Sequence, residues 1–135
     1  MKKVAILYGG PSSEHEVSVQ SGKNIFKNID TNKYTVFEIF INKDKTFFIG
    51  KNKTGLNEKA FSDFLKKEKI DIVLPVLHGE YGEDGQIQKV LEKNKIQFVG
   101  SGSKVSSIAI DKDKSNKIYQ KNKILIPKSK IITFK

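Results

Sequence analysis

Apolar residues recur along this chain in two patterns, which together predict a parallel α/β sheet. Continuous apolar runs, typical of buried parallel strands, alternate with stretches where apolar residues recur every three or four positions, as in half-buried helices. The predicted strands are residues 3–8, 35–41, 71–77 and 96–99, with a short hairpin partner at 46–49 and one more strand at 131–134. The predicted helices run from residue 14 or 15 to 29 and over 58–67, 86–94, 105–110 and 112–122. Alternating strands and helices favour a doubly wound parallel sheet flanked by helices.

Glycine-rich loops follow three of the predicted strands. They are Gly9–Ser13, His78–Gly85 and Gly100–Ser103. Because the carboxyl ends of parallel strands lie at one edge of a sheet, we expect these loops to converge on a ligand site. Glycine lets the backbone approach a ligand closely, and the helix N-termini that begin there favour anionic groups.

The first of these loops leads into the densest group of reactive side chains. Residues 9–18 read Gly-Gly-Pro-Ser-Ser-Glu-His-Glu-Val-Ser, with two carboxylates, one imidazole and several hydroxyls. We expect Ser12 or Ser13 to cap the following helix, since serine is a favoured N-cap residue. Glu14 has two interpretations: a first-turn residue favoured by the helix dipole, or a carboxylate that binds a positively charged ligand group.

The composition is that of a globular chain. Its 135 residues suffice for one domain, with 37% hydrophobic and 30% charged residues. No apolar run approaches the roughly 20 residues that cross a bilayer, and the N-terminus lacks a secretory leader. Cysteine is absent, so disulfides and thiolate metal sites are excluded. These features predict a cytoplasmic protein that is not bound to membranes.

The formal net charge of +10 raises the question of nucleic-acid binding. All of the basic side chains are lysines, and they are spread along the chain instead of being clustered. Arginine, which makes bidentate contacts to phosphates and bases, is missing. We therefore interpret the lysines mainly as solvated surface and expect no nucleic-acid partner.

Three blocks of residues resemble a known family. They are Gly9–Ser18, the string His-Gly-Glu-Tyr-Gly-Glu-Asp-Gly-Gln-Ile-Gln at 78–88, and Phe98–Gly102 followed by Ile110-Asp111-Lys112. In order and spacing they resemble the motifs of D-alanine–D-alanine ligases, enzymes of the ATP-grasp family. The resemblance runs from the first strand to the end of the chain. It implies the Rossmann-like, pre-ATP-grasp fold of the family's N-terminal domain.

The resemblance also implies a reaction. These ligases use ATP and Mg²⁺ to phosphorylate the carboxylate of one D-alanine, and the amine of a second D-alanine attacks the acyl phosphate. The dipeptide enters peptidoglycan synthesis. Such chemistry needs positioning and charge neutralisation more than a covalent enzyme intermediate.

Several site residues follow from the resemblance. Glu14 matches the catalytic glutamate that holds the ammonium of the first D-alanine, and His78 matches a histidine beside that substrate. Val17 and Ser18 match positions near the substrate, and Lys112 matches a lysine that approaches the ATP phosphates. ATP and Mg²⁺ are expected to be bound mainly by family regions that have no counterpart here, and the family usually forms homodimers.

Some positions depart from the family pattern. Lys89 stands where a small residue usually follows Gln88, which questions how closely its helix packs near the loop. Other departures are Asn116 for lysine, Gln97 for proline and Ile110 for methionine. Glu83 and Asp84 could be a metal pair, but we expect them to anchor the loop and cap the next helix, and we assign no metal ligand.

The resemblance divides the chain at residue 122. Residues 1–122 are expected to form the substrate-binding domain, and 123–135 the start of a linker or central domain. On this interpretation the chain is an N-terminal fragment that folds but does not ligate by itself. Three alternatives remain: a stand-alone metabolite-binding module with the same fold, a nucleic-acid binder, and a D-alanine–D-lactate ligase.

Overall fold

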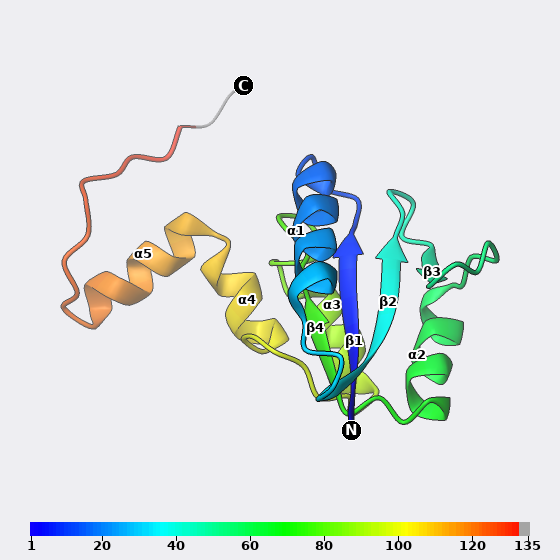
Figure 1. Ribbon diagram of the computed structural model, residues 1–135. Helices are drawn as coiled ribbons and strands as arrows, with labels where there is room; N and C mark the ends of the chain where they lie inside the picture. The colour runs from blue at the N-terminus through cyan, green and yellow to red at the C-terminus, as the bar shows by residue number, and fades with distance from the viewer. Residues whose placement is uncertain (133–135) are drawn as a thin grey trace.

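A four-stranded sheet with helices on both faces forms the body of the molecule (Figure 1). The computed structural model describes residues 1–132. In chain order the elements are β1 (Lys2–Gly9), α1 (His15–Asn28), β2 (Tyr34–Ile41), β3 (Phe47–Ile49), α2 (Glu58–Lys67), β4 (Ile72–Pro75), α3 (Gln86–Lys93), α4 (Ser103–Ala109) and α5 (Lys112–Lys121). None of the helices in this range is long and apolar enough to cross a membrane.

The strand order is β3-β2-β1-β4, with β1 paired in parallel to both β2 and β4. Val4 faces Val36 on one side and Ile72 on the other, so β1 is the central strand. Only β3 runs antiparallel, paired with the end of β2. The predicted fold class, a parallel sheet flanked by helices, is confirmed.

The strand predicted at 96–99 is wrong. Only Phe98 pairs with the sheet, through an isolated parallel bridge to Val73. Lys95 and Gly100 on either side have φ angles of 57° and 120°, and these left-handed conformations interrupt an extended run. At the other predicted end strand, Ile131 and Ile132 form no strand, and residues 133–134 lie outside the described residues.

One face of the sheet carries the apolar core. Side chains of β1 and β2 that alternate toward this face meet α2 and α3. At its centre the rings of Phe47 and Phe61 stack with centroids 4.1 Å apart and planes 6° apart. The core residues without measurable exposure include Ala5, Leu7, Ile39, Ile41, Phe47, Phe61, Val73, Ile87 and Leu91. Each large apolar side chain buried here stabilises the fold by about 1.5–3 kcal/mol.

The other face of the sheet is covered by α1. The fully buried positions of α1 are His15, Ser18 and Gly22, whereas Val17 is 54% exposed. The half-buried Phe26 packs edge-on against Tyr8 of β1, with ring centroids 5.9 Å apart. A Cβ on Gly22 would lie 2.6 Å from Cγ of Tyr8, so the missing side chain lets the helix lie directly on β1. A stripe of small and polar side chains, together with Phe26, therefore makes the contact.

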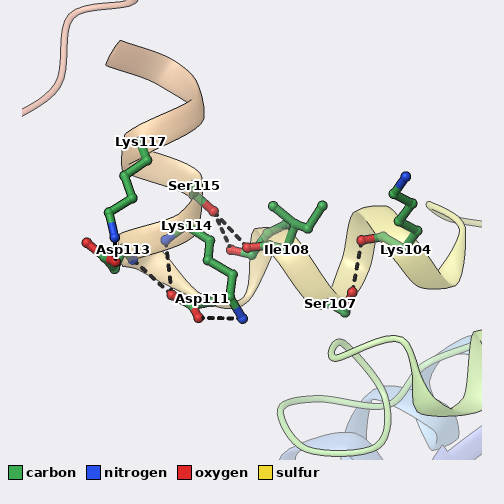
Figure 2. A network of polar contacts seen from close by, with 9 residues as sticks. Lys104, Ser107, Ile108, Asp111, Asp113, Lys114, Ser115 and Lys117 are labelled. Carbon is green, nitrogen blue, oxygen red and sulfur yellow. Dashed lines mark hydrogen bonds and ion pairs between the residues drawn. The ribbon is translucent and has the colours of Figure 1, made fainter. Parts of the chain in front are cut away.

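Helices α4 and α5 form an arm beside the sheet, with α4 nearer to it (Figure 1). Asp111 caps α5 by accepting hydrogen bonds of 3.1 Å from the N–H groups of Asp113 and Lys114 (Figure 2). The Ser115 hydroxyl lies 3.0 and 3.1 Å from the carbonyl oxygens of Ile108 and Ala109, the last residues of α4. These contacts fix the angle between the two short helices.

Candidate functional site at the ends of β1 and β4

The backbone turns sharply where β1 ends. Gly9 and Gly10 have φ angles of 93° and 91°, which residues with a Cβ rarely adopt. A Cβ on Gly9 would also lie 2.3 Å from the Ile41 carbonyl oxygen. The N–H of Gly10 donates to that oxygen at 2.7 Å, which ties the turn to the end of β2. Glycine is therefore required at position 9 by both conformation and space.

The start of α1 differs from the prediction at its cap. The N-cap position is Glu14, not Ser12 or Ser13, and the Glu14 side chain makes no capping bond. Ser12 Oγ instead accepts a 2.9 Å hydrogen bond from the Glu14 N–H, which stabilises the turn before the helix. The Glu14 carboxylate is thus exposed at the helix start and not used by it.

Three side chains of α1 hold the ends of the neighbouring segments. Ser18 Oγ accepts from the Gly9 N–H at 2.8 Å and donates to the Val76 carbonyl at 2.6 Å. His15 Nδ1 lies 2.6 Å from the Gly10 carbonyl oxygen, and it must carry a proton because a carbonyl only accepts. Ser21 Oγ lies 3.3 Å from His78 Nε2. Helix α1 therefore holds the loops after β1 and β4 in place.

Two carboxylates anchor the loop at 78–85, as predicted. Glu83 accepts from the Gly79 N–H at 2.9 Å, and Asp84 accepts from the N–H groups of Tyr81 and Gln86, each at 3.0 Å. Burial raises the pKa of Asp84, but these N–H groups and the Gln86 amide outweigh it and hold that pKa below its usual value. The bonds confirm that both residues fix the loop. The expected cap is wrong in part, because the N-cap of α3 is Gly85, and only Asp84 binds the first residue of that helix.

Lys89 does not disturb the helix that follows this loop. Its side chain is exposed, and its N–H donates to the Gly85 carbonyl at 2.9 Å. A Cβ on Gly85 would lie 2.3 Å from the Ser103 carbonyl oxygen, so the helix start is closely packed. The departure from the family pattern at position 89 is thus accommodated at the surface.

The first two loops adjoin each other. A Cβ on Gly79 would lie 3.2 Å from Ser12 Oγ and 3.5 Å from a carboxylate oxygen of Glu14. Glu14 and the half-buried His78 therefore sit on touching segments at the carboxyl ends of β1 and β4. The third loop meets the second at its far end, through the contact between Gly85 and Ser103. The three loops are contiguous, with residues 78–85 in the middle.

The other expected site residues lie in different surroundings. Ser18 has no measurable exposure, and its only proton is bound to the Val76 carbonyl. Val17 is half exposed, one turn of α1 after Glu14. Lys112 is exposed and begins α5, on the arm (Figure 1). The structure thus places Glu14 and His78 on adjoining loops and Lys112 on the arm of α4 and α5.

Sequence reasoning missed Ser21 and the structural part of His15. His15 is one of the buried positions 15, 18 and 22 of α1, which recur every three or four residues, and the half-buried Ser21 lies next to this stripe. That spacing places them on one helix face. A search for small and polar residues at helical spacing, and not only apolar ones, would have found them.

The corner formed by Glu14 and His78 is open. The best-formed clefts along residues 1–132 have volumes of about 230 to 410 Å³, and neither residue lines them. Within the same range no group of three or more histidine, cysteine, aspartate or glutamate side chains is placed to hold a metal ion.

Comparison with known proteins gives a consistent result. The family described as the D-ala D-ala ligase N-terminus matches residues 3–67 and 52–101. A D-alanine–D-alanine ligase of Clostridium novyi is 43% identical over 123 residues, which are 82% of this chain and 36% of that protein.

Solved structures show the same similarity. The VanG D-Ala:D-Ser ligase of Enterococcus faecalis aligns with a TM-score of 0.75 and 32% identity, over 94% of this chain and 43% of that one. The D-alanine–D-alanine ligase of Bacillus anthracis, complexed with ATP, aligns with a TM-score of 0.73 and 35% identity, over 95% of this chain and 38% of that one. The chain thus spans about two fifths of the length of these relatives. With the family's N-terminal region matched from residue 3 to residue 101, this chain belongs to the D-alanine–D-alanine ligase family.

Proposed function

We propose that this chain supplies the first-substrate half of an ATP-dependent D-alanine–D-alanine ligase. In the proposed reaction ATP phosphorylates the carboxylate of one D-alanine, and the amine of a second displaces the phosphate to form the dipeptide for peptidoglycan. Family membership and the ATP complex of the Bacillus anthracis relative support this proposal. Because the reaction consumes ATP, we expect it to run in the cytoplasm.

The observation that carries the proposal is the meeting of Glu14 and His78 on adjoining loops. Within residues 1–132 the Glu14 carboxylate accepts no hydrogen bond and makes no ion pair. A free carboxylate at the carboxyl end of a parallel sheet suits the ammonium group of an amino acid. We assign it to the first D-alanine, with His78 beside it.

Val17 and Ser18 take different parts in this proposal. Val17 is exposed one turn after Glu14 and offers an apolar surface to the substrate methyl group. We assign Ser18 no direct contact with the substrate, because its hydroxyl is hydrogen-bonded to Gly9 and Val76. These bonds hold the two strand ends at a fixed distance. The contribution of Ser18 is to position the loops.

Lys112 is the residue of this chain that we propose to contact the phosphates of ATP. A lysine suits phosphate as a compact charge, and Lys112 makes no ion pair within residues 1–132. Its place on the arm, apart from Glu14, requires that the phosphates approach from that side. We assign no step on this chain to Mg²⁺.

We propose residues 1–122 as the substrate-binding domain and residues 123–135 as the beginning of the next part. The described part of that stretch, residues 123–132, contains no helix or strand. We also propose a homodimer, as the family resemblance implies. Size-exclusion chromatography with light scattering gives the mass in solution, and a monomer at all concentrations would contradict the dimer.

The test uses the 135-residue chain itself, labelled with ¹⁵N. Titration with D-alanine is expected to shift the amide signals of residues 12–15 and 78–80, whereas L-alanine leaves them unchanged. We expect no ATP-dependent dipeptide from this chain alone. Absence of any D-alanine effect up to the solubility limit would remove the proposed site. Retention of labelled DNA or RNA in a gel at low salt, lost at high salt, would favour the nucleic-acid binder instead.

The second substrate is a separate question. One relative is a D-Ala:D-Ser ligase, so the similarity extends to an enzyme with a different second substrate. On this chain, D-serine and D-lactate are titrated beside D-alanine to test which groups of the first substrate are recognised. A signal shift with D-lactate as large as that with D-alanine would indicate that the ammonium is not recognised, and would contradict the role given to Glu14.

A further inference from the structure

The imidazole of His78 has one hydrogen-bond partner within residues 1–132, and that partner is Ser21. Ser21 Oγ lies 3.3 Å from Nε2 of the ring. The two residues are 57 positions apart, and the bond joins α1 to the loop after β4. Both side chains are half-buried. The orientation of the His78 ring is therefore set from α1.

The Ser21 proton has no competing acceptor in the described part of the chain. A serine inside a helix often turns its hydroxyl to the carbonyl four residues earlier, as Ser62 does toward Glu58 at 2.9 Å. Ser21 makes no such bond within residues 1–132, and its proton is free to point at Nε2. We infer that Ser21 is a positioning residue for His78, whose hydroxyl donates to Nε2 and keeps the ring proton on Nδ1.

The tautomer decides what His78 offers to a ligand. A neutral imidazole has one nitrogen that donates and one that accepts. With Nε2 bonded to Ser21, the remaining nitrogen is an N–H donor. A donor on the loop that adjoins the Glu14 carboxylate suits a ligand with both an ammonium group and an oxygen acceptor, as an amino acid has. This consequence rests on the proposed function, whereas the bond to Ser21 does not.

His15 is an internal reference for the measurement. The chain has two histidines, and the bond to the Gly10 carbonyl requires the proton on Nδ1 of His15. Both rings are therefore expected to show the same tautomer in the unaltered protein. Only the His78 ring depends on Ser21.

The experiment reads both rings by NMR. The full chain is labelled with ¹⁵N in its histidines, and the nitrogen shifts are recorded at about pH 8.5, above the ordinary titration range of histidine. In the unaltered chain both rings should show protonated Nδ1. In Ser21→Ala the His78 ring should move toward the Nε2-protonated form while His15 stays unchanged, and Ser21→Thr should restore the original pattern. Ser21→Cys, with a weak donor, gives the same comparison if the alanine variant does not fold.

The outcomes separate this inference from the proposed function. Unchanged His78 shifts in Ser21→Ala, or an Nε2-protonated ring in the unaltered chain, would overturn it. D-alanine should bind Ser21→Ala about fivefold more weakly, the effect of one neutral hydrogen bond. If the tautomer switches but D-alanine affects neither protein, the bond between Ser21 and His78 stands and the proposed substrate site fails.

Discussion

The Ser18 hydroxyl bridges two strand ends that are far apart in the chain, since it accepts from the Gly9 N–H at 2.8 Å and donates to the Val76 carbonyl at 2.6 Å. β1 and β4 are paired up to Leu7 and Pro75, so the hydroxyl replaces the next rung of the ladder. Both backbone groups are satisfied by one side chain that has no measurable exposure. The loops that carry Glu14 and His78 begin from this bridge.

Removal of the bridge should be costly. Ser18→Ala leaves a buried N–H and a carbonyl without a side-chain partner, and we expect a loss of about 1–3 kcal/mol in the free energy of unfolding. Urea denaturation of the full chain measures it. Ser13→Ala, at an exposed position of the same turn, is the matched control and should change stability by less than about 0.5 kcal/mol. Equal effects of the two changes would contradict the role given to Ser18.

Gly22 tests the close contact between α1 and β1. Alanine favours a helix by about 1 kcal/mol relative to glycine. Its Cβ would lie 2.6 Å and 2.8 Å from two atoms of Tyr8, however, and overpacking of this kind costs about 1–3 kcal/mol. We expect Gly22→Ala to lower the melting temperature, whereas Lys23→Ala on the exposed side of α1 leaves it unchanged or raises it. A stabilised Gly22→Ala protein would show that the helix can move off the strand.

Asp84 should give the fold a dependence on acidic pH. The folded protein holds the pKa of Asp84 below its value in the unfolded chain, which is about 4. The carboxylate therefore contributes its full stabilisation above about pH 4, and this stabilisation is lost as the pH falls through the folded-state pKa. Asp84→Asn should therefore lower stability near pH 7 by about 1 kcal/mol, a modest amount because the carboxylate is partly solvated. The difference from the unaltered chain should shrink below about pH 4.

The matched control for that prediction is Asp63→Asn, an exposed position of α2. Urea titrations at several pH values compare the two variants. A gap between Asp84→Asn and the unaltered chain that stays constant down to pH 3 would show that the loop bonds do not depend on the charge of Asp84.

Glu14 should matter for binding and not for folding. Its carboxylate has no partner within residues 1–132, so Glu14→Gln should keep the stability of the chain. Loss of a charged contact to an ammonium group should weaken D-alanine binding by roughly tenfold or more. Calorimetry or NMR titration measures it, with Glu16→Gln, two positions later on the exposed side, as the control. Equal affinity of both variants would count against the assignment.

The sequence predicts the sheet well where the signal is a long apolar run. Residues 4–8 and 35–41 are continuous in apolar or β-branched residues apart from Glu38, and they form β1 and β2 within one residue of the expected ends. Phe98 shows the opposite case. The apolar run around Phe98 is short, and Lys95 and Gly100 on either side have left-handed backbone conformations. The strand propensities of residues 96–99 do not indicate those conformations.

The sequence indicates where the site lies, but not which role each of its residues has. The glycine loops and the family motifs lead to Glu14 and His78, and the structure brings their segments together. Ser18 belongs to the same motif as Glu14, yet it faces the strand ends, because position 18 shares a helix face with His15 and Gly22. The direction in which a residue points depends on how α1 sits on β1. That in turn depends on Gly22 and Tyr8, which carry no functional signal in the sequence.

The arm of α4 and α5 has a consequence for how the molecule opens. Most of the apolar cluster of the fold lies in the sheet, α2 and α3, while α5 packs mainly on α4. Little of α5 is buried: Ser115 is its buried residue, and the side chains of Ile118 and Tyr119 are more than 40% exposed. Amide hydrogens of α5 should therefore exchange with solvent through local opening, long before those of β1 do. Lys112 would then lie on a helix that opens at a low cost in free energy. Glu14 would lie beside β1, which opens only when the whole sheet unfolds.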